Sequence, residues 1–121
     1  MAYDDSNIFA KILRKEIPCE SVYEDEWVLA FKDIQPQAPI HVLVIPKGSY
    51  ESIADFGARG SAEEIAGFYR AVSKIASDLG IEKDGFRTIA NTGVHGGQEV
   101  PHFHMHLLGG SSLGPMLAQA A

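Results

Sequence analysis

Three histidines lie within five residues of this 121-residue chain, at positions 102, 104 and 106. Side chains on a β-strand point alternately to opposite faces, so an extended segment would place His102, His104 and His106 together and the apolar residues between them on the other side. We therefore predict a strand from His102 to Leu108, with a solvent-facing row of imidazoles backed by the core.

Such a row of imidazoles suits two kinds of chemistry. Neutral imidazoles bind catalytic zinc, usually together with a further ligand such as a carboxylate. Glu99 is the nearest acidic residue but lies beyond Pro101, and no Asp or Glu follows His106. Alternatively, an imidazole that is neutral at pH 7 can attack phosphorus when an acceptor, such as a neighbouring carbonyl, holds its other nitrogen. The residues alone leave both chemistries open.

The segment immediately before the histidines is rich in glycine. Gly93, Gly96 and Gly97 have no side chains, so their backbone N–H groups can approach an anion closely. Donors of this kind would meet the negative charge of a phosphoryl group without lysine or arginine. A plain turn is the alternative interpretation of the same glycines.

Hydrophobic periodicity predicts the elements that must position these groups. Apolar pairs spaced by four residues predict a short helix, capped by Ser6 and ending before Pro18. A capping box of Ser61 and Glu64 starts a long helix over 61–79, and Gly80 ends it. Strands are expected at 21–24, 28–33, 41–45, 86–91 and 102–108. The expected fold class is α+β, with a five-stranded, mainly antiparallel sheet, one long helix and one short helix.

Composition limits the possible partners and the location of the protein. The net charge of -6, without a clustered basic face, argues against nucleic acid polymers. No apolar run is long enough to span a membrane, and the single Cys19 allows no internal disulfide, so we expect a cytoplasmic protein. We also expect one domain over 1–121, with its core at about 6–110 and a divergent C-terminal tail at 111–121.

The run His102–Leu108 matches the motif His-φ-His-φ-His-φ-φ, where φ is hydrophobic, and so resembles the histidine-triad (HIT) superfamily. Further similarity at 7–18, 30–39, 41–47 and 91–98 is typical of its HINT branch. This resemblance implies a HIT-like fold whose sheet continues across a homodimer. It also implies a purine nucleoside phosphoramidase, which hydrolyses adenosine or guanosine 5′-phosphoramidates (AMP or GMP conjugates) to the nucleoside monophosphate and an amine, without a cofactor.

The same resemblance implies individual roles. His104 would be the nucleophile that forms a nucleotidyl-histidine intermediate, while His41, His102 and His106 position the phosphate and relay protons. Asp33 would bind the ribose hydroxyls. The other implied nucleotide contacts are Ile8, Phe9, Ile12, Ile17, Phe31 and Ile34 at the base and sugar, and Asn91, Gly97, Gln98 and Glu99 near the phosphate.

Some positions depart from the HINT pattern or allow other interpretations. Glu99 stands where that pattern usually has a serine, and its charge would repel an anion. Asn7 and Ala10 replace the cysteines that bind zinc in some relatives, so no metal is expected. By residue type alone, Asp33 and Asn91 could equally cap turns. The alternative functions are a dinucleoside polyphosphate hydrolase and a non-catalytic adaptor that binds purine nucleotides.

Overall fold

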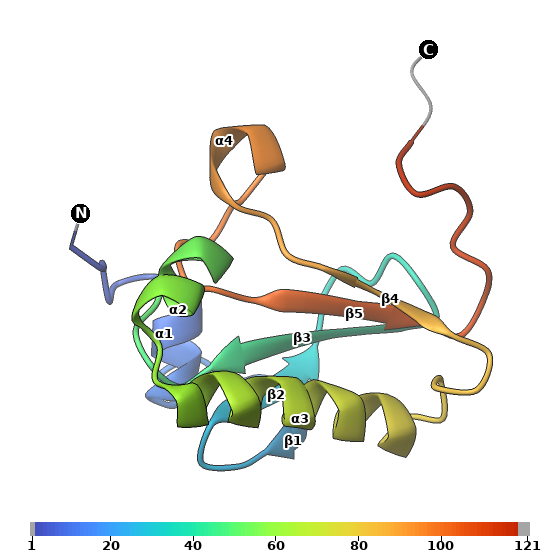
Figure 1. The fold of residues 1–121 in the computed structure, drawn as a ribbon, viewed down its shortest axis with the longest axis horizontal. Coiled ribbons are helices and arrows are strands. Elements are labelled where there is room, and N and C mark those ends of the chain that lie inside the picture. Colours follow the sequence, from blue (N-terminus) through green and yellow to red (C-terminus); the bar gives the residue numbers. More distant parts are fainter. Residues whose placement is uncertain (1, 119–121) are drawn as a thin grey trace.

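A strand buried on both faces, β3 (Ile40–Pro46), lies at the centre of the molecule (Figure 1). The computed structural model describes residues 2–118 and forms a five-stranded sheet in the order β1-β2-β3-β5-β4. All neighbouring strands pair antiparallel. The remaining strands are β1 (Ser21–Glu24), β2 (Val28–Lys32), β4 (Phe86–Ile89) and β5 (Met105–Gly109). The predicted α+β class and antiparallel sheet are confirmed.

Two hydrophobic clusters cover the two faces of the sheet. On β3, Val42 and Val44 pack into the cluster beneath α3 (Ala62–Asp78), whereas Leu43 and Ile45 pack into the cluster that includes α1 (Ile8–Leu13). This alternation follows from the two-residue period of a strand. Both faces of β3 are apolar because each is covered by a helix, which is typical of a strand formed by a continuous apolar run.

The α1 face also carries the histidines. Leu43 of β3 lies opposite His106 of β5 in the antiparallel register, so these two side chains share a face. Met105 and Leu107 alternate with His106 and are buried in the α3 cluster. The prediction that the histidines and the apolar residues of this strand point to opposite faces is therefore confirmed over β5.

Several predicted boundaries were wrong. The fifth strand begins at Met105 instead of His102, and the strands expected at 28–33 and 86–91 end at Lys32 and Ile89. Asn7, not Ser6, caps α1, because its side-chain oxygen accepts a hydrogen bond from the Ala10 N–H.

Two helices were not expected. Ser52 caps α2 (Ile53–Arg59), and α4 (Gly93–Gly96) forms one turn within the glycine-rich connection. Both are short and contain glycine, so their sequences lack a helical periodicity long enough to detect. Within residues 2–118, no helix is long and apolar enough to cross a membrane.

The predicted tail is partly described. Residues 111–118 form no helix or strand and extend away from the sheet (Figure 1). The Arg87 guanidinium of β4 donates hydrogen bonds to the carbonyl oxygens of Gly114 and Pro115, which ties the start of the tail to the sheet edge. The last three residues of the predicted tail, 119–121, lie outside the described part of the chain.

The long helix α3 confirms the prediction closely, including the reciprocal capping box between Ser61 and Glu64.

Gly67 lies within α3 at the point where the Trp27 side chain packs against the helix. A Cβ atom at Gly67 would lie 2.4 Å from Cγ and Cδ1 of Trp27, closer than side chains approach one another. The glycine is therefore explained by packing and not by backbone conformation.

We expect Gly67→Ala to lower the free energy of unfolding by about 1 kcal/mol or more. The steric cost of crowding Trp27 exceeds the roughly 1 kcal/mol that alanine contributes to a helix. Gly57→Ala in α2 is the matched control, because nothing lies within 4 Å of its added Cβ, and it should stabilise the protein slightly. Urea denaturation of both variants checks this, and equal stabilisation by the two substitutions would contradict it.

Candidate active site

Four histidines gather on the α1 face of the sheet. His41 comes from β3 and His106 from β5, whereas His102 and His104 lie in the irregular segment just before β5. His41, His102 and His104 are buried, and His106 is half-buried. The fifth histidine, His95, is exposed on α4 and separate from this group.

His104 is held in the state that a nucleophile requires. Its Nδ1 lies 2.8 Å from the backbone carbonyl oxygen of His102. A carbonyl oxygen only accepts hydrogen bonds, so Nδ1 carries the proton and the lone pair remains on Nε2. Burial lowers the pKa of His104, which keeps the ring neutral at pH 7. The neighbouring acceptor that the nucleophilic interpretation needed is the carbonyl two residues earlier.

An aromatic ring supports His104 from α1. Phe9 meets the imidazole edge-on, with 4.9 Å between the ring centroids. Phe9 is itself buried in the α1 cluster and packs edge-on against Phe31 of β2. The plane of the His104 ring is therefore set by packing on one side and by the hydrogen bond to His102 on the other.

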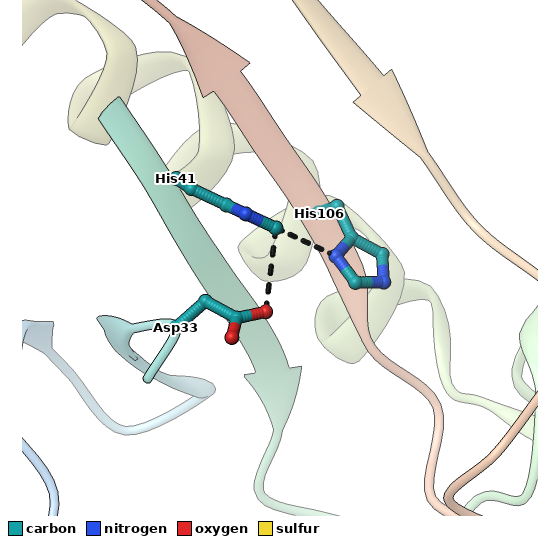
Figure 2. Close-up of side chains that lie close together, drawn as sticks. All are labelled: Asp33, His41 and His106. Carbon is teal, nitrogen blue, oxygen red and sulfur yellow. Dashed lines mark hydrogen bonds and ion pairs between the residues drawn. The ribbon is translucent and has the colours of Figure 1, made fainter. Parts of the chain in front are cut away.

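His41 and His106 form a directed hydrogen-bond relay, shown in Figure 2. The backbone N–H of Gln37 donates to Nδ1 of His41 over 3.0 Å, so the proton of neutral His41 is on Nε2. That Nε2–H donates to Nδ1 of His106 over 2.9 Å. His106 must then carry its own proton on Nε2, which makes this atom a donor toward a bound anion.

The charge state of His106 agrees with this relay. Burial and its histidine neighbours lower the pKa of His106 to about 4, so the ring is neutral near pH 7. Its centroid lies 5.2 Å from that of His104. The site thus places a lone pair on His104 beside an N–H donor on His106. The role of Gln37 could not be predicted from the sequence, because it contributes its backbone N–H and not its side chain.

Asp33 joins the relay from the turn between β2 and β3. Its Oδ1 accepts a hydrogen bond from the Gln35 N–H, which confirms the turn-capping interpretation. Its Oδ2 lies 3.4 Å from Nε2 of His41 (Figure 2). The carboxylate therefore has a structural contact through one oxygen and adjoins the histidine relay through the other.

Asp33, His41 and His106 also form a set of ligands suited to a divalent metal ion, with one donor atom each within 4.8 Å of one another. In the sequence Glu99 is the acidic residue nearest to the histidines, whereas the fold brings in the carboxylate of Asp33. An ion between His41 and His106 would have to displace the proton that they share.

The structure contradicts the prediction that all three triad histidines line an accessible face. His102 is 1% exposed, and both of its ring nitrogens are occupied. Nε2 lies 2.9 Å from the carbonyl oxygen of Pro46, and Nδ1 lies 2.5 Å from the hydroxyl of Tyr3. Neither nitrogen is left for a phosphate. The reason is that the chain is not in the sheet at this point, and the N-terminal segment covers the ring.

The residues implied for the base and sugar divide into two groups. Phe9, Ile12 and Phe31 are buried in the α1 cluster, and Ile17 packs against it. Ile8 and Ile34 are exposed, Ile34 by 93%. The large apolar side chains of Ile8 and Ile34 are therefore available to contact a ligand, whereas the buried residues are part of the core on the α1 face.

A cavity of about 290 Å³ lies beside the buried group, lined in part by Ile12, Ile17 and Leu29. A larger one, of about 740 Å³, is lined by residues of the N-terminal segment and α2, including Tyr3, Ser49 and Arg59. No histidine lines either cavity, so neither contains the groups that could react.

The polar residues implied near the phosphate mostly hold their own loop together. The Asn91 amide donates to the Gly96 carbonyl over 2.7 Å. The Gln98 amide accepts from the Gly93 N–H and donates to the carbonyl oxygens of Val100 and Glu51. These bonds attach the loop to the segment before α2.

Gly97 and Glu99 play different parts in this loop. Gly97 has φ of 73°, a conformation that favours glycine. Glu99 is exposed, and its charge acts to raise the pKa of His104 against the larger effect of burial. The Glu99 carboxylate is thus close enough to influence His104 electrostatically.

Comparisons with known proteins identify the family of this chain. The family model for the HIT domain matches residues 14–113. A HIT-like protein of Azospirillum brasilense is 52% identical over 97% of this chain and 96% of its own. The purine nucleoside phosphoramidase of Escherichia coli (strain K12) is 50% identical, covering 94% and 95% of the two chains.

A solved structure, the HIT family hydrolase from Clostridium thermocellum, shares the fold with a TM-score of 0.86 and 43% identity. The match covers 95% of this chain and 99% of that one. The family match includes His41, His104, His106 and Asp33, which the structure brings together at one site. The chain therefore belongs to the HIT domain family.

Proposed function

We propose that this protein is a HIT-type hydrolase that cleaves the phosphorus–nitrogen bond of purine nucleoside 5′-phosphoramidates. The observation that carries the proposal is the hydrogen bond from Nδ1 of His104 to the His102 carbonyl, which leaves Nε2 free to attack phosphorus. The similarity to the Escherichia coli purine nucleoside phosphoramidase supports this choice of substrate.

The reaction would proceed in two displacements. Nε2 of His104 attacks the phosphorus, the bond to nitrogen breaks, and the amine leaves with a proton supplied by the relay of His106 and His41. Water then attacks the phosphorus of the nucleotidyl-histidine and returns a proton to the relay, which releases the nucleoside monophosphate and restores His104. The Nε2–H of His106, directed by His41, supplies a hydrogen bond to the negative charge of the phosphoryl group.

Turnover of adenosine 5′-phosphoramidate, followed by chromatography with and without a chelator, tests this function. We expect hydrolysis to AMP that is insensitive to the chelator. Loss of activity together with stoichiometric zinc would instead favour a metal held by Asp33, His41 and His106. Faster cleavage of a dinucleoside triphosphate would favour the polyphosphate hydrolase, and AMP binding without any hydrolysis would favour the adaptor.

The homodimer implied by the family resemblance is part of this proposal. The edge strand β4 supports it, since Phe86 there is 39% exposed and its strand pairs on one side only within residues 2–118. A free strand edge with an exposed aromatic side chain is suited to pairing with a second copy.

Asp33→Asn tests the assignment of Asp33 to the ribose hydroxyls. The asparagine keeps the oxygen that accepts from Gln35 but loses the charge, so kcat/KM on the ribose substrate should fall about tenfold or more. The 2′-deoxy substrate should be poorer for the wild-type protein by a similar factor. In the variant, removing the hydroxyl should cost little more, because the interaction is already lost.

Steady-state kinetics of the wild-type protein and of Asp33→Asn, each on the ribose and the 2′-deoxy substrate, measures these effects. Undiminished discrimination between them in Asp33→Asn, with kcat lowered equally on both, would show that Asp33 acts through His41 and not on the sugar.

A further inference from the structure

We propose that Tyr3 is a positioning residue for the nucleophile His104, acting through the buried ring of His102; the inference rests on the proposed function. Tyr3 lies 99 residues from His102 in the sequence and outside the residues 14–113 that match the family model. No motif in the sequence singles it out. The structure nevertheless places its hydroxyl against the histidine that precedes the nucleophile.

The direction of each hydrogen bond follows from the partners. Nε2 of His102 lies 2.9 Å from the Pro46 carbonyl oxygen, which can only accept, so Nε2 carries the proton of this neutral ring. Nδ1 of His102 is then an acceptor. The Tyr3 hydroxyl, 2.5 Å away, must be the donor to it.

Asn7 sets the orientation of that hydroxyl. The Asn7 Nδ2 donates to the Tyr3 oxygen over 2.9 Å and to the Asp4 carbonyl over 2.8 Å, while its Oδ1 caps α1 through the Ala10 N–H. With an N–H already directed at its oxygen, Tyr3 is left to donate its own proton to His102. The first turn of α1 and the N-terminal segment thus hold the tyrosine in place.

The connection to the nucleophile is through the backbone of His102. Its carbonyl oxygen is the acceptor that holds Nδ1 of His104. Both ring nitrogens of His102 are bonded and the side chain is 1% exposed, so the ring is held in one orientation. A fixed ring restrains the backbone of the same residue, and with it the direction of the carbonyl oxygen. Releasing one ring nitrogen would loosen the residue that fixes the tautomer and direction of His104.

A purely structural role is the alternative, because a buried imidazole nitrogen needs a partner in any protein. The two roles predict different measurements. A structural hydroxyl would affect the free energy of unfolding alone, whereas a positioning hydroxyl would also lower kcat in the folded enzyme without weakening substrate binding.

The test is Tyr3→Phe, which keeps the aromatic ring that packs edge-on against His102 and removes only the hydroxyl. We expect kcat for adenosine 5′-phosphoramidate to fall roughly tenfold, with KM changed less than about twofold. Tyr69→Phe on the exposed side of α3 is the matched control and should keep the wild-type kcat. An unchanged kcat in Tyr3→Phe would overturn the proposal.

Asn7→Ser gives an independent variant, since serine still caps α1 but has no amide to direct the Tyr3 hydroxyl. It should lower kcat in the same sense, and the double variant Tyr3→Phe/Asn7→Ser should be no slower than Tyr3→Phe alone. Independent, multiplying effects of the two substitutions would contradict a shared route to His102.

Nuclear magnetic resonance of the histidine rings separates this inference from the proposed function. In the wild-type protein the Nδ1–H of His104, bonded to the His102 carbonyl, should be protected from exchange with water. Tyr3→Phe should accelerate that exchange, while Tyr69→Phe should not. If the wild-type protein hydrolyses no phosphoramidate, the proposed function fails, and this exchange measurement still decides whether Tyr3 positions His104.

Discussion

Replacement of His104 by asparagine is expected to lower kcat for adenosine 5′-phosphoramidate by about 10⁴-fold or more. The amide of asparagine can still donate to the His102 carbonyl, as Nδ1 of the histidine does, but nothing replaces the lone pair on Nε2. The variant thus removes the attacking atom while keeping its support. Single-turnover and steady-state assays of AMP release measure the effect.

The affinity of His104→Asn for AMP and its thermal stability must be measured together with its kcat. The Kd for AMP should change little, because nucleotide binding does not depend on the attacking lone pair. His104 is buried, contrary to the accessible position expected from the strand pattern, so the variant also leaves a small cavity and its thermal stability must be checked. His95→Asn, at an exposed position on α4, is the matched control and should retain full activity.

Residual turnover of His104→Asn within tenfold of wild type would reject the covalent mechanism. A mass-spectrometric search for the nucleotidyl adduct gives a second criterion. The adduct should accumulate on the wild-type protein with a slowly hydrolysed substrate and be absent from the variant.

The second large effect concerns acid stability, to which His102 contributes together with His104 and His106, whose pKa values are also lowered. Burial lowers the pKa of His102 to about 4 in the folded protein, against 6.5 for an ordinary histidine. Between these values the unfolded chain binds the proton and the folded protein does not, so stability rises with pH in this range. The stabilisation is complete above pH 6.5 and is lost as the pH falls toward 4, by about 3 kcal/mol.

Urea denaturation at several pH values between 7 and 4 checks this dependence. His102→Gln removes the titrating ring, so its free energy of unfolding should fall less steeply over the same range, even if it starts lower at pH 7. The carboxyl of Asp55, whose pKa the Arg59 guanidinium lowers to about 2, affects stability chiefly below pH 4 and does not obscure the test. Parallel curves for the wild type and the variant would show that His102 is not responsible.

Local patterns predicted the elements that depend on nearby residues. The β-branched run of β3 required cover on both faces, and the capping box of Ser61 and Glu64 marked the start of α3. The short helices α2 and α4 escaped prediction because each is too short to show a helical periodicity, and because the loop that contains α4 is held by the bonds of Gln98 to Gly93 and to the distant Glu51.

The candidate site shows the same division between local and distant effects. The spacing of His104 and His106 brings their rings together on one face, because both lie near β5 and the period of an extended chain is two. The spacing did not reveal that His102 turns into the interior, since the ring is held there by Pro46 and Tyr3, which are distant along the sequence.

Taken by itself, the sequence determined the α+β class, the central strand β3, the long helix α3 and the presence of closely spaced imidazoles near residue 104. Only the tertiary structure decided which imidazole has a free lone pair, because that depends on the acceptor each ring nitrogen meets. It also decided which carboxylate joins the site. Asp33 contacts His41 because the turn between β2 and β3 returns the chain to the sheet. The spacing of the two residues along the sequence does not predict this contact.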